Sequence, residues 1–159
     1  MAVAPVWSIV RMNYYAQALA DEAQMSLAHG VLTGLAENKV GFVSRDDLAA
    51  AVAGLLAGEG HEGAIYTGTG PAAISGAERA AMIADITGKP MAFLVLPKAA
   101  LEGGLRQAGL PEEVINVVVS IQEGFAKGGF DIVTGDVERL SGRPPEDLGS
   151  ILRRAFAPS

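Results

Sequence analysis

The chain has 159 residues, which is enough for one domain with a substantial core. Half of the residues are hydrophobic and 19% are charged, a balance that excludes a largely disordered chain. The net charge of -6 argues against a nucleic-acid surface, and the absence of cysteine excludes disulfides, thiolate metal sites and cysteine nucleophiles.

No uninterrupted apolar run approaches the roughly 20 residues of a membrane span. The first residues, MAVAP, lack the charged segment that opens a signal peptide. We therefore expect a cytoplasmic protein that contacts neither membrane nor nucleic acid.

The first third of the chain predicts two extended segments separated by a helix. Residues 6–10, VWSIV, form a short apolar run typical of a buried strand. Residues 13–29 favour a helix that stops at Gly30. Residues 40–43 are a second short extended piece.

The middle third carries clear helix-start signals. Ser44 can cap a helix whose apolar positions fall on one face: Leu48, Val52, Leu55 and Leu56. A third strand is expected over 64–67. Ser75 and Glu78 then form a capping box for a helix that ends near Gly88, and 92–96 is a fourth strand.

The last third is mostly helical. A helix over 98–108 contains two glycines, each weakening it by about 1 kcal/mol. A second helix, 112–126, has an apolar stripe of Val114, Val118, Ile121 and Phe125. Short helices are expected over 136–140 and 147–156. Strands and helices alternate without repeats or linkers, so residues 1–159 are expected to form a single α/β unit.

Several familiar chemistries are missing. The segment Gly68-Thr69-Gly70-Pro71 follows a strand but lacks the third glycine of a dinucleotide-binding turn, so we interpret it as an ordinary turn. His29 and His61 are interpreted as solvated, and no metal site is expected. Asp46 and Asp47 point about 100° apart on a helix, which favours capping over a catalytic carboxylate pair.

Polar and aromatic residues gather after the first strand. Asn13, Tyr14, Tyr15 and Gln17 come directly after it, and Tyr66 lies on the third strand. These residues either bury their rings structurally or line a ligand site at the carboxyl ends of strands. Both interpretations stand on sequence grounds, and no residue is assigned to catalysis.

Five segments in order extend the interpretation to the whole chain: WSIVRMNYYAQ, VGFVSRDDLAAAVAGLL, GHEGAIYTGTGP, ISGAERAAMIADITGKP and FDIVTGDVERLSGRPPEDL. Together they resemble the C-terminal half of NmrA-like atypical short-chain dehydrogenases, especially bacterial NAD(P)H:quinone oxidoreductases. The resemblance implies the C-terminal portion of a doubly wound Rossmann-like fold, with few, mainly parallel strands and a helical substrate lobe. The N-terminal dinucleotide-binding half would be lacking.

The resemblance also implies roles for particular residues. Asn13, Tyr14 and Tyr15 would line the pocket beside the nicotinamide and substrate, and Tyr66 would begin a segment that closes the substrate lobe. NADPH is the family's cofactor, but its phosphate-binding glycines would precede Met1. We therefore expect no cofactor binding and no redox activity from this chain alone.

An alternative function is a non-catalytic module that binds a small molecule or assembles as a dimer. A buried-type strand over 6–10 with a bare edge invites pairing with another chain. We expect a homodimer in which this strand edge or the helix 112–126 is covered by the partner.

Overall fold

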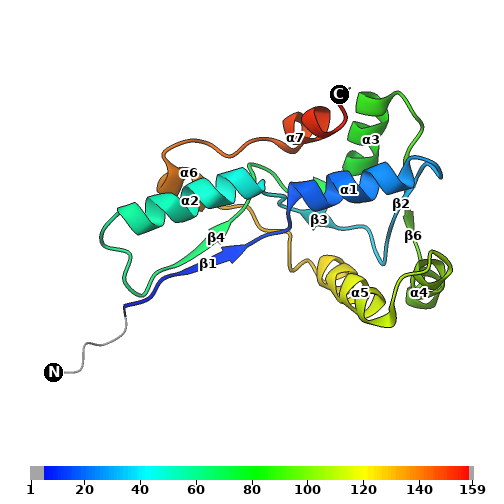
Figure 1. Cartoon of the computed structure of the whole chain (residues 1–159), viewed down its shortest axis with the longest axis horizontal. Helices are drawn as coiled ribbons and strands as arrows, with labels where there is room; N and C mark the ends of the chain where they lie inside the picture. Colours follow the sequence, from blue (N-terminus) through cyan, green and yellow to red (C-terminus); the bar gives the residue numbers. More distant parts are fainter. Residues whose placement is uncertain (1–5, 158–159) are drawn as a thin grey trace.

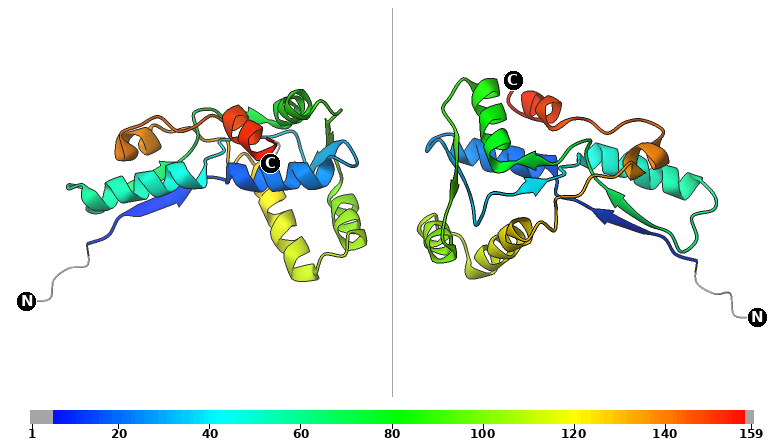
Figure 2. Two further views of the ribbon diagram at one scale, coloured as in Figure 1. Left: turned by 45° about the horizontal axis from the view of Figure 1, so that its top comes forward. Right: turned by 180° about the vertical axis from the view of Figure 1, so that it is seen from behind.

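The computed structural model describes residues 6–157 and arranges them in an elongated α/β architecture (Figure 1). One end holds a two-stranded ribbon with two helices, and the other holds five helices around two further strand pairs (Figure 2). Within the described residues no helix is long and apolar enough to cross a membrane.

The elements alternate along the chain as expected for an α/β protein. In order, they are β1 (Ile9–Met12), α1 (Ala16–Ser26), β2 (Val31–Gly34), β3 (Lys39–Val40), α2 (Arg45–Ala57), β4 (Ile65–Gly68), β5 (Ile74–Ser75), α3 (Gly76–Thr87), β6 (Ala92–Val95), α4 (Lys98–Gln107), α5 (Glu112–Ala126), α6 (Asp136–Ser141) and α7 (Leu148–Ala155).

The strands pair in twos. β1 runs parallel to β4, with Ile9 opposite Ile65, and β2 runs parallel to β6. The short β3 and β5 are antiparallel. The expectation of few, mainly parallel strands with a helical lobe is confirmed, although β2 and β5 were not foreseen.

The local helix signals act where the sequence places them. The Ser44 hydroxyl accepts from the Asp47 amide and starts α2, while Ser75 and Glu78 form the expected capping box of α3. Gly88 ends α3 in the left-handed region, with φ of 66°, which glycine adopts without strain. The expected bounds 112–126 match α5.

Two sequence predictions about burial are wrong. The first strand begins at Ile9 rather than at residue 6, and Val6 and Trp7 are exposed. β1 has β4 as its only strand neighbour in the described chain, so its side chains are mostly uncovered. On α5, Ile115 and Val119 are buried instead of the predicted Val114, because they face α4.

The main core joins both ends of the sequence. α1 and α3 pack on β2, and α7 packs on α1 and α3; the buried side chains include Leu19, Leu32, Ile83, Phe125 and Leu152. A second cluster between α2 and α6 contains Leu48 and Val137, and a third lies between α4 and α5. The first helix is shorter than expected: it begins at Ala16, which leaves Asn13 to Tyr15 in the connection after β1.

Candidate functional site

The end of β1 is fixed by the amide of Asn13. Its Nδ2 donates to the backbone oxygens of Phe130 and Ile132, at 3.1 and 3.4 Å, and its Oδ1 accepts from the Tyr14 amide at 2.8 Å. Asn13 is buried. Its polar atoms therefore hold the 130–132 segment against the strand end and position Tyr14.

Tyr14 is directed into an aromatic cluster. Its ring packs edge-on against Phe125 and Phe130, with centroids 5.1 and 6.3 Å away, and against Phe42 at 6.2 Å. Edge-to-face contacts of this kind fix a ring's orientation. Burial raises the pKa of the Tyr14 hydroxyl, and Glu22 adds to the shift when it is ionised, so the phenol is neutral and able to donate.

Tyr14 lies on the wall of an open cleft of about 330 Å³ between α1, β2, α4 and α5, which we call the central cleft. Most of its walls are apolar, with leucines at 101, 105 and 110 and Ile121 opposite α1. The polar lining residues come from α1, β2 and α5 and include Asp21, Glu22, Thr33 and Gln122.

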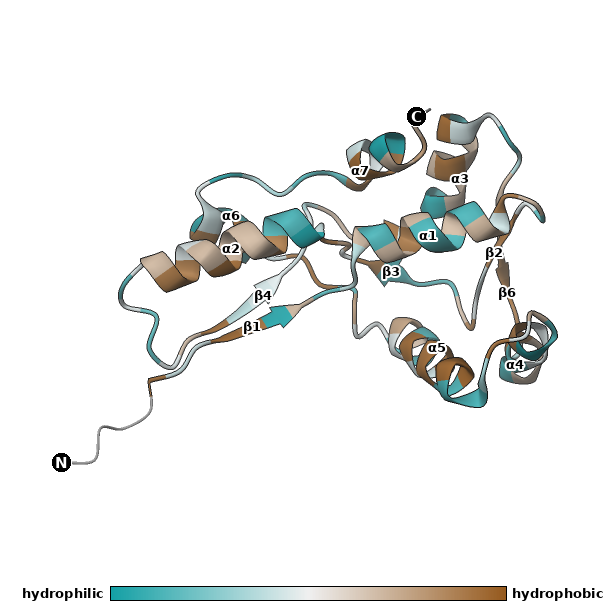
Figure 3. Ribbon diagram, in the orientation of Figure 1, coloured by the Kyte–Doolittle hydropathy of each residue, from teal (hydrophilic) through white to brown (hydrophobic). Residues whose placement is uncertain are grey.

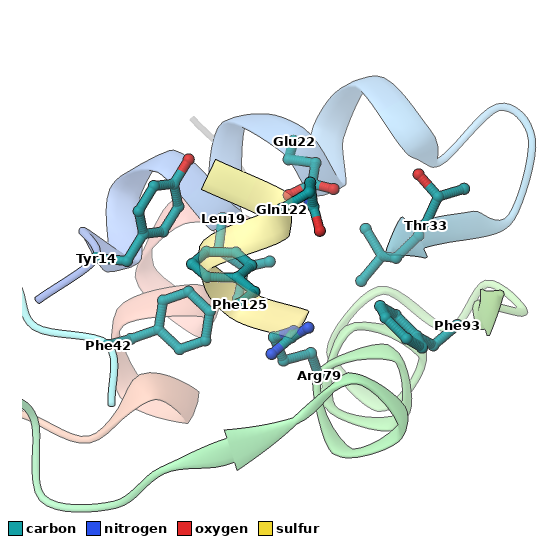
Figure 4. Close-up of a pocket in the computed structure, with 10 residues that line it drawn as sticks. Tyr14, Leu19, Glu22, Thr33, Phe42, Arg79, Phe93, Gln122 and Phe125 are labelled. Atoms are coloured by element: carbon teal, nitrogen blue, oxygen red, sulfur yellow. The ribbon is translucent and has the colours of Figure 1, made fainter. Parts of the chain in front are cut away.

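A small enclosed space adjoins the central cleft, and we call it the inner chamber (Figure 4). It measures about 10 Å³, close to the space that a single water molecule needs. Tyr14, Glu22, Thr33 and Gln122 line both spaces, while Arg79 lines only the chamber. These four shared residues therefore form the boundary between the open apolar cleft and a polar interior.

Arg79 is the cation of the inner chamber. It is buried, and it donates to the Ile74 oxygen at 3.0 Å and to Asn38 Oδ1 at 2.9 Å. Its guanidinium carbon lies 5.5 Å from the centroid of the Phe42 ring and 5.4 Å from that of Phe93. These contacts satisfy a buried charge without a carboxylate at ion-pairing distance in the described chain.

The other predicted site residues lie elsewhere. Tyr15 lines a shallow surface cleft along α2, with the Arg45 guanidinium carbon 5.3 Å from its ring centroid. Gln17 Oε1 accepts from the Arg45 amide at 3.2 Å. Tyr15 and Gln17 thus meet at the start of α2 rather than at the central cleft.

Tyr66 is also separate from Tyr14. Its ring is buried on β4, its hydroxyl lies 2.7 Å from His61 Nδ1, and the Arg139 guanidinium carbon lies 4.8 Å from its centroid. It lines neither the central cleft nor the cleft at Tyr15. His61 is therefore bonded to Tyr66 rather than simply solvated, which corrects the sequence interpretation.

Sequence reasoning missed Glu22, Thr33 and Gln122. One signal was available: Leu19 and Ala23 belong to the buried stripe of α1, and Glu22 stands three residues after Leu19, at the border of that stripe. A carboxylate at such a border indicates a buried polar function. Gln122 carried no comparable signal. It lines the same two spaces as Glu22 but lies 100 residues later in the chain, so only the fold brings the two side chains to one lining.

The starts of α2 and α3 and the turn after β4 offer few free amides to a phosphate group. The start of α2 is capped by Ser44, and Glu37 Oε1 accepts from the Gly76 amide at the start of α3. At the expected turn after β4, Thr69 is fully buried and Gly70 packs against the Phe42 carbonyl. These residues do not fit a dinucleotide pyrophosphate. No cluster of three metal-type ligands occurs in the described part either.

Comparisons with known proteins define the class. No protein-family model matches the chain. It is 28% identical over 152 residues to quinone oxidoreductase 2 of Escherichia coli, covering 95% of this chain and 53% of that protein. It is 30% identical over 142 residues to an NAD(P)H azoreductase of Xenophilus azovorans, covering 87% and 49% respectively.

Solved structures agree with the sequence comparison. An NADPH-dependent quinone oxidoreductase of Escherichia coli, solved with NADPH, superposes with a TM-score of 0.90 at 27% identity, over 96% of this chain and 54% of that one. A Citrobacter triphenylmethane reductase shares the fold, with a TM-score of 0.86 at 22% identity over 95% and 53%. The chain spans about half the length of the relatives it matches.

The fold and these relatives define a unit of the Rossmann-like NAD(P)-dependent reductases. Within that class the chain belongs to the NmrA-like reductases and corresponds to their C-terminal half, as its sequence segments indicate.

Proposed function

We propose that this chain is the acceptor-binding half of an NAD(P)H-dependent reductase of the quinone-reductase type, and that the central cleft holds the acceptor. Two relatives support this assignment by the activities for which they are named, quinone and azo reduction. Both activities concern flat conjugated molecules. The acceptor class is therefore a planar aromatic compound with electron-poor double bonds.

The shape of the central cleft is the observation that carries the proposal. Its volume of about 330 Å³ suits a ligand of one or two fused rings. Leu101, Leu105 and Ile121 offer apolar contact to ring faces, and every polar lining residue except Asp21 also lines the inner chamber. Small-molecule sites typically combine apolar walls with a few directed polar groups.

The chain by itself is proposed not to bind NADPH. The amides at the starts of α2 and α3 are already bonded to Ser44, Ser75 and Glu37, so these two helix termini are not free to bind the pyrophosphate. Hydride transfer needs the cofactor held within about 3–3.5 Å of the acceptor, which half a site cannot achieve. We therefore expect the chain to bind the electron acceptor without binding the cofactor.

Calorimetric titration of the chain tests both statements. Menadione, 2-methyl-1,4-naphthoquinone, is expected to bind saturably, and NADPH is expected to give no heat of binding at micromolar concentrations. Leu105→Trp fills the central cleft and should abolish menadione binding, whereas Leu105→Met preserves the volume and should retain it. Micromolar affinity for NADPH, or unchanged menadione binding by Leu105→Trp, would contradict the proposal.

We further propose that the isolated chain self-associates through the open face of the β1–β4 ribbon. Ile9 and Ile65 are paired in register on that face and are 43% and 48% exposed, and Leu56 of α2 is 80% exposed. Apolar colouring follows the outer part of this end (Figure 3). The other edge of β4 is protected by Asp136, whose Oδ2 accepts from the Thr67 amide, but β1 has no second strand partner among residues 6–157.

Light scattering at rising protein concentration measures this association. The wild-type chain is expected to form dimers, because an apolar ribbon face with a free strand edge favours pairing. Ile65→Lys places a charge in the middle of the face and should yield monomers. Val117→Lys, on the exposed side of α5, should leave the dimer intact. Dimers lost only in Val117→Lys would assign the interface to helix 112–126 instead.

A further inference from the structure

Glu22 is the one acidic side chain shared by the central cleft and the inner chamber. It is partly buried on α1, between the buried Leu19 and Ala23 of the same helix. In the described part of the chain it makes neither a hydrogen bond through its carboxyl group nor an ion pair. Its carboxyl group is therefore free to meet a ligand in the cleft.

The charges around Glu22 leave its carboxyl group without a counter-ion. Arg79 of α3 faces it across the chamber, but that guanidinium is bonded to Ile74 and Asn38 and held between two rings. Tyr14 and Thr33 are neutral, and Asp21 adds a like charge from the same helix. Burial raises the pKa of Glu22, and the Arg79 charge offsets this only in part.

The inner chamber also contains a hydrogen-bond acceptor that has no donor within residues 6–157. Gln122 Oε1, on α5, is buried and has no hydrogen-bond partner among the described residues. Figure 4 shows Glu22 and Gln122 as part of the same lining. Burial raises the pKa of Glu22 and so favours the acid form, whose one proton can be donated either to Gln122 Oε1 or to a ligand carbonyl; a carboxylate has no proton to donate.

We propose that Glu22 is the specificity-determining residue of the central cleft: its carboxylic acid donates a hydrogen bond to a carbonyl oxygen of the acceptor. The cleft consequently prefers quinones to hydrocarbons of the same shape. This inference rests on the proposed acceptor-binding function and adds to it the group that recognises the acceptor.

Paired ligands test the contact in the full chain. Menadione and 2-methylnaphthalene share a ring skeleton, and only the first has carbonyl groups. The wild-type chain is expected to bind menadione about tenfold more tightly, the value of one net hydrogen bond. The preference should vanish in Glu22→Ala and persist in Glu22→Gln, which retains an N–H donor. It should be unchanged in Asp46→Asn, an exposed carboxylate on α2 that does not line the central cleft.

The pH dependence separates an acid donor from mere packing. As pH rises through the raised pKa of Glu22, the acid loses its proton, and the preference for menadione should fall in the wild-type chain and in Asp46→Asn. Glu22→Gln does not titrate, so its preference should stay constant. At pH values above the ordinary pKa of glutamate, infrared spectra should still show the C=O stretch of a protonated carboxylic acid. This band should be absent from Glu22→Gln.

Each outcome has a definite meaning. A preference that survives in Glu22→Ala, or an identical pH profile in Glu22→Gln, overturns the contact. Equal binding of both compounds by the wild-type chain overturns the contact and leaves the acceptor site standing. Binding of neither compound overturns the proposed function together with the contact that rests on it.

Discussion

Gly54→Ala is expected to lower the free energy of unfolding by about 3 kcal/mol, the upper range for overpacking a close contact. Gly54 lies in α2 where that helix crosses α6, and a methyl group there would collide with the backbone carbonyl of Leu140. A carbonyl cannot rotate away as a side chain can. The two helices must therefore separate, which opens the cluster of Leu48 and Val137.

Gly103→Ala is the matched control for this substitution. Gly103 also lies inside a helix, α4, but a methyl group there meets no other atom. Alanine should stabilise that helix by up to about 1 kcal/mol. Urea unfolding followed by circular dichroism compares the two variants at one protein concentration. Equal stability of Gly54→Ala and the wild-type chain would show that α2 and α6 do not pack as closely as described.

Asp47→Ala is expected to cost about 2–3 kcal/mol of unfolding free energy, because it removes charge-assisted bonds from a buried carboxylate. Asp47 Oδ1 lies 2.7 Å from an Arg143 guanidinium nitrogen, and Oδ2 accepts from the Glu146 amide at 2.8 Å. The Arg143 side chain is half exposed, so water compensates part of its loss. The carboxylate joins α2 to the connection between α6 and α7.

Neighbouring substitutions distinguish this linkage from a general effect of charge. Asp46→Ala removes an exposed carboxylate from the same helical turn and should cost less than about 1 kcal/mol, the range of a helix-dipole contribution. Asp47→Asn keeps an acceptor for the Glu146 amide and should fall between the two. If both alanine variants unfold at the same urea concentration, Asp47 does not have the role described.

Local signals made much of the fold predictable. The capping residues Ser44 and Ser75 start α2 and α3 where the sequence indicates, because each cap bonds an amide only three residues away. Gly88 ends α3 by the same short-range logic. The adjacent Asp46 and Asp47 were less predictable: both lie at a helix start, but only Asp47 is turned inward, toward a connection some 100 residues later.

Burial and the candidate site depended on distant parts of the chain. The apolar run that ends at Val10 resembles a core strand in sequence, yet β1 is mostly exposed because β4 is its only strand neighbour among residues 6–157. Tyr14 was predicted at a ligand site and lies on the central cleft, while Tyr15 and Tyr66 face other regions. The polar boundary of the cleft joins α1 to α5, a pairing that no local pattern encodes.

The exposed start of the β1 segment gives the chain an optical reporter of its own. Trp7 is the single tryptophan and is 49% exposed next to the ribbon face. Indole emission shifts to shorter wavelength when water leaves the ring, so unlabelled protein signals when that region is covered. The central cleft lies among α1, β2, α4 and α5, so the same fluorophore stands apart from ligands that enter there.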